Sequence, residues 1–221
     1  AMVTLQTTNI DLVICMPGTA DNDAFSVARS IKQAFKNIPC VVLTPFSHGI
    51  TKRMKNEDLR MFDYVFCWLG NTNLILSIIK LIEDKMNIAH DIRESGVQMI
   101  LLVEDSIRFY SSILPNLYSY ILAQSKRFST EALNKHQATL RMRGRPKVVL
   151  ARTYEEAMTI YNQFSDNCLG VICDARFPMK ETSTDENDKL PSPLRDTDVY
   201  KDPEAGLKLL RAIRAKDEYV P

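Results

Sequence analysis

Glycine is scarce in this sequence, and long apolar runs are missing. The seven glycines among 221 residues are scattered singly, so no glycine-rich loop of the kind that cradles nucleotide phosphates is present. No apolar run approaches the ~20 residues that a membrane-spanning helix needs, and the start does not resemble a secretory signal. The sequence therefore indicates neither a P-loop nucleotide site nor a membrane protein, and we expect a cytoplasmic location.

Excess charge and paired metal ligands are missing as well. The formal net charge is +1, which argues against bulk nucleic acid or an anionic membrane surface as a partner. The three histidines, His48, His90 and His136, show no metal-ligand spacing, and the five cysteines form no CxxC pair. Four of these cysteines lie inside apolar runs, so we interpret them as buried, reduced thiols.

The apolar content is sufficient for a sizeable core, because apolar residues make up 45% of the chain. Short apolar runs bounded by turn-forming residues alternate with stretches in which apolar residues recur every three or four positions. The runs that we expect to be strands are 10–16, 38–44, 63–69, 97–104, 147–151 and 169–174. Strands that alternate with helices favour an α/β fold with a doubly wound parallel sheet.

Two helical features between these strands stand out, and so does the end of the sequence. A helical tract runs from about residue 106 to residue 142, and Pro115 interrupts it. Thr153, with Glu156 three residues later, forms a capping box at the start of a further helix. The last expected helix covers residues 202–215, and the sequence stops soon after it at Pro221, where a parallel sheet would normally receive its next strand.

Three segments are interpreted as irregular or exposed. Residues 87–97 are polar and are interpreted as a linker. Residues 179–202 are charged, rich in Ser, Thr and Pro, and are expected to form a long, mobile loop. Leu140–Pro146 holds three arginines without interleaved aromatic residues, which favours a solvated helix end over a nucleic-acid contact.

Two of the expected strands end on carboxylates. Glu104 and Asp105 close one strand, and Asp174 closes another. If the two strands are neighbours in a parallel sheet, their carboxyl ends meet at the same edge, where ligands bind. Three acids at one place repel each other unless a cation offsets the repulsion, and oxygen ligands suit Mg²⁺. A carboxylate beside Mg²⁺ can accept a phosphoryl group, and Asp174 is the candidate. The alternative is that all three acids are solvated strand ends.

The segments "ILLVEDS", "KVVLARTYEEAM" and "LGVICDARFP" closely resemble the first three strands of a receiver domain from two-component response regulators. The resemblance covers about residues 97 to 215 and implies a flavodoxin-like, doubly wound parallel sheet. It implies that Glu104 and Asp105 are the acidic pair, that Asp174 is phosphorylated, and that the backbone carbonyl of Arg176 is a further Mg²⁺ ligand.

The first half resembles the other end of a receiver. "DLVICMPGTADNDAF" is similar to the third strand and its loop, but Met16 occupies the phosphorylation position. Thr44 matches the fourth-strand Thr, and the position of the fifth-strand Lys falls at or near Cys67. Residues 3–86 therefore resemble strands three to five of a degenerate receiver, and residues 98–221 resemble strands one to three of a second one.

The second half departs from a receiver in three respects. Its helical tract at 106–142 is about twice the usual length, the loop at 179–202 is longer than a receiver needs, and a fourth-strand Thr and fifth-strand Lys would lie beyond Pro221. "EDSIRFYSSILPNLYSYIL" with "LRMRGRP" specifically resembles the tandem receiver region that precedes phosphoenolpyruvate synthase or pyruvate phosphate dikinase-type domains in some bacterial proteins. That resemblance implies a regulatory module rather than the phosphotransferase itself.

Two arrangements of the halves follow from the strand count. The halves could close into one sheet within a chain, with the strand of Thr44 serving Asp174, or two chains could exchange halves as a homodimer. One six-stranded sheet would support the first arrangement, and strands that cross between chains would support the second. Two separate three-stranded sheets would refute both.

The leading interpretation is a two-component receiver module, in which Mg²⁺-dependent phosphorylation of Asp174 regulates a neighbouring output domain. The phosphoryl donor would be a sensor histidine kinase or a small phosphodonor, and the chain would not be a free-standing enzyme. The alternative is a non-phosphorylated scaffold whose long helical tract mediates dimerisation or docking. A haloacid-dehalogenase-like phosphatase is disfavoured, because that family needs a second Asp where Arg176 stands.

Overall fold

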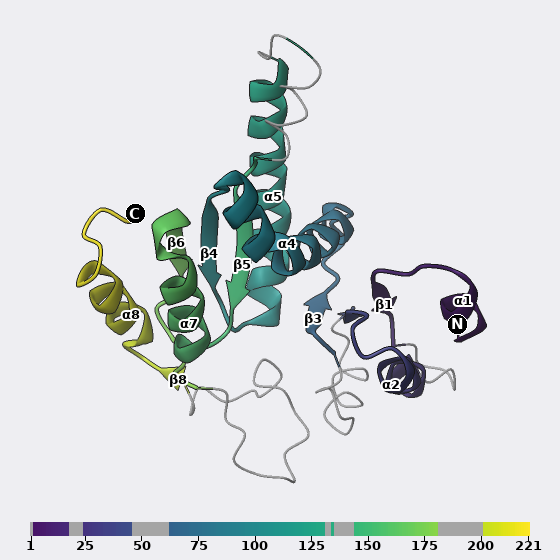
Figure 1. Cartoon of the computed structure of the whole chain (residues 1–221). Coiled ribbons are helices and arrows are strands. Elements are labelled where there is room, and N and C mark those ends of the chain that lie inside the picture. Colours follow the sequence, from purple (N-terminus) through teal and green to yellow (C-terminus); the bar gives the residue numbers. More distant parts are fainter. Residues whose placement is uncertain (1, 18–23, 46–61, 131–133, 135–143, 181–200) are drawn as a thin grey trace. The chain divides into compact units, whose positions relative to one another are not determined.

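The computed structural model describes residues 2–17, 24–45, 62–130, 134, 144–180 and 201–221. The chain falls into two compact units, one with the described residues up to Asn71 and the other with the described residues from Thr72 onwards. Figure 1 labels the elements of both units. Each unit contains a parallel three-stranded sheet, so the α/β class with parallel strands is confirmed.

The first unit is a sheet of order β1-β2-β3 with a helix between the first two strands. Its described elements are α1 (Met2–Thr7), β1 (Val13–Cys15), α2 (Ala24–Ala34), β2 (Cys40–Thr44) and β3 (Tyr64–Cys67). The α2 helix buries Phe25, Ala28 and Ile31, which recur at helical spacing. The Asp63 carboxylate accepts a hydrogen bond from the Cys40 backbone N–H at 2.8 Å, and this bond joins the start of β3 to β2.

The second unit has the sheet order β5-β4-β6, so β4 is central. Its described elements are α4 (Asn73–Ser95), β4 (Met99–Val103), α5 (Ile107–Thr130), β5 (Lys147–Ala151), α7 (Tyr154–Phe164), the 3-10 helix η1 (Ser165–Asn167), β6 (Cys168–Cys173), β7 (Phe177–Pro178), β8 (Lys201–Asp202) and α8 (Ala205–Arg214). Both neighbours of β4 run parallel to it. The short strands β7 and β8 form a separate antiparallel pair.

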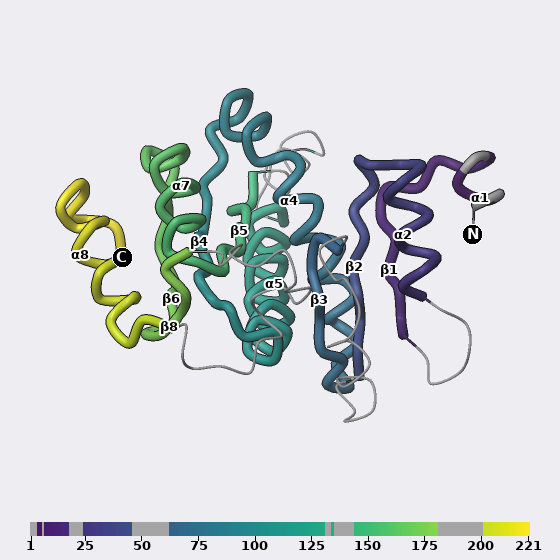
Figure 2. The backbone as a smooth tube through the Cα atoms, turned by 90° about the horizontal axis from the view of Figure 1, so that it is seen from below, coloured from purple at the N-terminus to yellow at the C-terminus, as the bar shows by residue number. Residues whose placement is uncertain are grey.

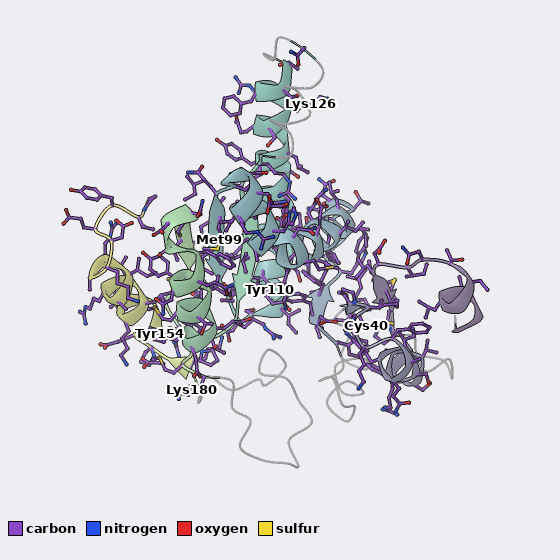
Figure 3. All side chains as sticks on the ribbon, viewed as in Figure 1. Cys40, Met99, Tyr110, Lys126, Tyr154 and Lys180 are labelled. Carbon is purple, nitrogen blue, oxygen red and sulfur yellow. The ribbon has the colours of Figure 1, made fainter. Side chains whose placement is uncertain are left out.

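Helices cover this second sheet. The α7 helix packs on β4 and β5, α4 contacts α5 and β5, and α8 packs against α7 and β7. Figure 2 shows α8 in yellow beside α7 and β6. The core under α7 and α8 contains fully buried side chains such as Leu101, Tyr161 and Phe177. The C-terminal part of α5 extends past the strands, and Figure 3 labels Lys126 on this part.

A buried ionic network holds α4, α5 and β5 together. The fully buried carboxylate of Asp84 accepts hydrogen bonds from the Tyr118 hydroxyl at 2.9 Å and the Val148 backbone N–H at 3.0 Å. The Arg145 guanidinium donates two more, at 2.6 and 3.0 Å. A buried charge is costly unless it is paired and hydrogen-bonded. These contacts therefore stabilise the Asp84 carboxylate inside the core. Arg145 is itself buried, so the prediction of a solvated helix end is wrong for this residue.

The expected strands are present in the predicted order, most of them shorter than predicted. The capping box is also present, because the Thr153 hydroxyl accepts a hydrogen bond from the Glu156 backbone N–H at 3.2 Å. Residues 87–95 belong to α4, so the linker prediction is wrong there; the helix ends at Gly96, whose φ of 59° is the left-handed conformation that favours glycine.

The expected loop at 179–202 is bounded by structure. The β7 strand precedes it, β8 lies at its end, and residues 181–200 between them are outside the described residues. The α5 helix continues through Pro115 to Thr130, and most of the remaining predicted tract, to residue 142, is also outside the described residues.

The single flavodoxin-like sheet is not what the structure shows. The described strands form two separate three-stranded parallel sheets and one two-stranded pair, so closure into one sheet within this chain is wrong. Two separate three-stranded sheets are the outcome that refutes the rearrangement within one chain. A single chain does not test the exchange of halves between two chains, which stays a prediction. At the outer edge of β6, the Val171 backbone N–H donates to the Pro221 carbonyl at 3.0 Å, where another strand was expected to begin. Within the described part of the chain, no helix is long and apolar enough to cross a membrane.

Candidate functional site

The acidic residues follow the ends of two neighbouring strands. Val103 of β4 pairs with Cys173 of β6 in parallel register. The backbone ladder continues one residue further, because the Asp174 N–H donates to the Val103 carbonyl at 2.9 Å. Glu104 and Asp174 therefore leave the sheet at the same edge, beyond the carboxyl ends of the strands.

Three carboxylates meet at this edge. Glu104, Asp105 and Asp174 each offer one oxygen, and these oxygens lie within 4.8 Å of one another. Glu104 and Asp105 are buried, with 6% and 3% of their surface exposed, and Asp174 is half-buried. The convergence that the sequence led us to expect is therefore present. We call these three residues the acidic cluster.

The surroundings of the acidic cluster oppose ionisation. Burial raises the pKa of Glu104 to about 7, and the nearby charges of Asp174 and Asp105 act in the same direction. The hydrogen bond from the Ser106 N–H, at 2.9 Å from the Glu104 Oε1, only partly offsets these effects. Burial also raises the pKa of Asp105, against the opposing effect of the Lys201 ammonium. A site with raised carboxylate pKa values is one in which a bound cation relieves an existing electrostatic cost.

Lys201 is a member of the site that the sequence analysis missed. Its Nζ lies 2.9 Å from the Asp105 Oδ2 and 3.2 Å from the Oδ1. Lys201 falls in the segment 179–202, which the sequence predicts to be a loop and which holds many other charged residues. Its charge was visible in the sequence, but no local pattern links it to an acid 96 positions earlier.

The first turn of α8 lies directly against the backbone that follows β6. The Gly206 N–H donates to the Ala175 carbonyl at 3.1 Å. A Cβ atom at Gly206 would lie only 2.5 Å from the Asp174 carbonyl oxygen, closer than real Cβ contacts. Glycine is required at this position because the helix and the turn approach each other so closely. The Asp174 carboxylate accepts a hydrogen bond from the Ala175 N–H at 2.7 Å, so the same turn also orients the side chain.

The other predicted site residues lie as follows. Arg176 is in the turn between Asp174 and β7, with an exposed side chain, and metal binding by its backbone carbonyl stays a prediction. In the first unit, Met16 follows β1 and is 59% exposed, while Thr44 and Cys67 are buried at the ends of β2 and β3. Thr44 ends β2 and Asp174 follows β6, which are strands of two separate sheets, so the single sheet in which the strand of Thr44 would serve Asp174 is not formed within this chain.

The donor set of the acidic cluster fits a hard divalent cation. Mg²⁺ prefers oxygen ligands at ~2.1 Å, so two ligand oxygens on one ion are at most about 4.2 Å apart. The oxygens of the cluster, which lie within 4.8 Å of one another, can reach that spacing by small side-chain rotations. Mg²⁺ also retains several waters, so three carboxylates and a carbonyl need not complete its coordination.

Comparisons of the chain with protein-family models, with curated proteins and with solved structures found no match.

Proposed function

We propose that the second unit is a receiver-like signalling module that accepts a phosphoryl group on Asp174, with Mg²⁺ bound by Glu104, Asp105 and Asp174. The observation that carries this proposal is the convergence of three carboxylates from two neighbouring parallel strands. The resemblance of "ILLVEDS" and "LGVICDARFP" to the first and third strands of receivers supports the same assignment.

The three acids have different exposures, which suggests different roles. Glu104 and Asp105 are almost fully buried, so they are suited to hold a cation. Asp174 is half-buried and follows the edge strand β6, so a phosphoryl donor reaches it more easily. We assign Asp174 as the phosphoacceptor, and the backbone carbonyl of Arg176 as a further metal ligand.

The reaction is a transfer to a carboxylate. One oxygen of Asp174 forms a bond to the phosphorus of the donor, and the bond between that phosphorus and the donor atom breaks. The electron pair leaves with the donor group, and the product is an aspartyl phosphate. A divalent cation in the acidic cluster would supply positive charge to the phosphoryl oxygens. The donor is a sensor histidine kinase or a small phosphodonor. The phosphorylated module then acts on a neighbouring output domain.

A second candidate function is a scaffold that is not phosphorylated. The α5 helix exposes three aromatic side chains, Phe109, Tyr120 and Phe128, each of them more than half exposed. A helix that extends past its sheet with exposed aromatic residues is suited to dimerisation or docking.

Phosphorylation of the whole chain separates the two candidates. Incubation with acetyl phosphate and Mg²⁺ should add a hydroxylamine-sensitive phosphate, detected by intact-protein mass spectrometry. Asp174→Asn and chelation of Mg²⁺ should each abolish the product. The matched control is Asp166→Asn, which changes an exposed acid in η1, at the start of β6 and not at the end that carries Asp174. This variant should be phosphorylated as the wild type is.

Two outcomes would contradict the signalling function. A phosphate that persists in Asp174→Asn would show that Asp174 is not the acceptor. Mg²⁺ binding without any phosphorylation by acetyl phosphate would favour the scaffold.

A further inference from the structure

An ammonium group lies in the acidic cluster. The Lys201 Nζ is within 3.2 Å of both oxygens of the Asp105 carboxylate, so the two groups form a close ion pair. The Asp105 side chain is only 4% exposed and that of Lys201 is 22% exposed, so solvent screens this pair less than a surface pair. The chain itself therefore supplies a positive charge to three converging carboxylates.

The backbone around Lys201 is anchored, although the side chain is long. Lys201 pairs with Pro178 in the β7–β8 ribbon, and Asp202 pairs with Phe177, which is fully buried in the core. The Asp202 carboxylate accepts a hydrogen bond from the Glu204 N–H at 2.8 Å. The ribbon therefore fixes where the side chain starts, while the four-carbon stem of Lys201 allows its ammonium to move away from Asp105.

A divalent cation and this ammonium compete for the same oxygens. Mg²⁺ approaches its ligand oxygens to ~2.1 Å. A metal on Asp105 and an ammonium on the same carboxylate would be two close cations, which repel strongly in a partly buried place. An additional partner for Asp105 therefore weakens its binding of the metal.

We propose that Lys201 is a tethered competitor of Mg²⁺ at Asp105, which leaves this carboxylate when the metal binds and so sets the Mg²⁺ concentration at which the site fills. This inference rests on the proposed function, because it assigns the regulation of the same metal site. The β7–β8 ribbon would then regulate metal binding, because a movement of the ribbon moves Lys201 relative to Asp105 and so changes the affinity for Mg²⁺.

Titration of Mg²⁺ into the full chain, followed by calorimetry, tests the competition. Lys201→Met keeps an apolar stem and removes the charge, and it should bind Mg²⁺ more tightly by about tenfold. Lys201→Arg retains a cation and should bind Mg²⁺ nearly as the wild type does. The matched control is Lys216→Met, which removes the same charge after the C-terminal end of α8, where Lys216 contacts Asn162. This control should leave the affinity unchanged.

A labelling experiment on the wild-type chain does not depend on the folding of a variant. An amine-reactive ester should modify Lys201 slowly without Mg²⁺ and several-fold faster with saturating Mg²⁺, because the released ammonium is then exposed. Peptide mass spectrometry measures this rate, and the rate at Lys216 is the internal reference.

The outcomes separate the two proposals. Tighter Mg²⁺ binding by Lys201→Met, or faster labelling of Lys201 with Mg²⁺, supports the competition. Suppose that the wild type binds Mg²⁺ and that Asp174→Asn does not, but that neither the affinity of Lys201→Met nor the labelling rate of Lys201 changes. The competition is then overturned, and the metal site stands. If neither the wild type nor Lys201→Met binds Mg²⁺, the proposed function and the competition are overturned together.

Discussion

Glu104 must lose its proton to bind a metal, but its buried surroundings favour the protonated form. Its pKa is about 7 in the folded chain, against 4.5 for an ordinary Glu. Between these values the folded state binds more protons than the unfolded state, so the free energy of unfolding falls as the pH rises from about 4.5 to about 7. Above pH 7 the ionised Glu104 carboxylate lowers the free energy of unfolding by the full amount, and below pH 4.5, where Glu104 is protonated in both states, it does not lower it.

Glu104→Gln should remove this pH dependence. In chelator at pH 8, we expect the variant to be more stable than the wild type by on the order of 2 kcal/mol, which is less than full conversion of the shift because solvent screens part of the charge. At pH 4.5 that advantage should disappear. Urea unfolding at both pH values measures it, with the exposed Glu94→Gln as control. An advantage of the same size at both pH values would contradict the assignment.

The sequence around Asp84 predicts that this acid is buried with a cationic partner, but it does not identify the partner. It lies on the apolar stripe of α4 that includes Leu74, Ile78, Leu81 and Ile88. An acid in such a stripe predicts a buried cationic partner. The identity of that partner could not be predicted, because Arg145 is 61 residues away and reaches Asp84 only through the packing of α4 beside β5.

At the scale of elements, local patterns were informative wherever one face of an element is buried. The six longer strands follow from their apolar runs, and α7 follows from its cap and its period. Residues 87–95 of α4 are interpreted as a linker from the sequence because polar residues dominate them, although Ile88 and Ile92 continue the apolar stripe. The strands β7 and β8 have two residues each, too few for any periodicity. For the same reason Lys201 could not be placed in the site.

Gly206 connects a helix to the site, and its replacement tests that connection. Alanine usually stabilises a helix by about 1 kcal/mol relative to glycine. At Gly206 the added Cβ would lie 2.5 Å from one backbone atom and 3.0 Å from another, so α8 must move away from Asp174. We therefore expect Gly206→Ala to lower the free energy of unfolding by about 1–3 kcal/mol and to weaken Mg²⁺ binding.

The matched control for this variant is Gly170→Ala. Its added Cβ would meet Pro221 at 3.5 Å, an ordinary contact, so its effect on Mg²⁺ binding should be small. Urea unfolding and Mg²⁺ titration of both variants are the measurements. A stabilised Gly206→Ala with unchanged Mg²⁺ affinity would show that α8 does not position Asp174.

At the scale of the whole molecule, the convergence of the acids was predictable and the division of the sheets was not. Acids at the ends of two parallel strands meet whenever the strands are neighbours, which the order β5-β4-β6 satisfies. Whether two three-stranded sheets join at their edges depends on contacts between remote segments, and strand order along the chain carries no information about those contacts. The count of six strands was therefore compatible with one sheet or with two.

The division into two units leads to a prediction about metal-linked stability. The acidic cluster lies in the second unit, whereas Trp68, the single tryptophan of the chain, lies in the first. The longest described helices, α4 and α5, belong to the second unit, so circular dichroism reports mainly on that unit. Mg²⁺ at ten times its dissociation constant should stabilise the unit that binds it by ~1.4 kcal/mol.

If the units unfold independently, Mg²⁺ should raise the thermal midpoint seen by far-ultraviolet circular dichroism and leave the midpoint of Trp68 fluorescence unchanged. The dichroism shift should be lost in Asp174→Asn, because this variant lacks one of the three carboxylates. A Trp68 midpoint that rises together with the dichroism midpoint would show that the two units unfold as one. In that case the binding energy of the acidic cluster would stabilise the whole chain, and a signal at Asp174 would reach the first unit through their shared stability.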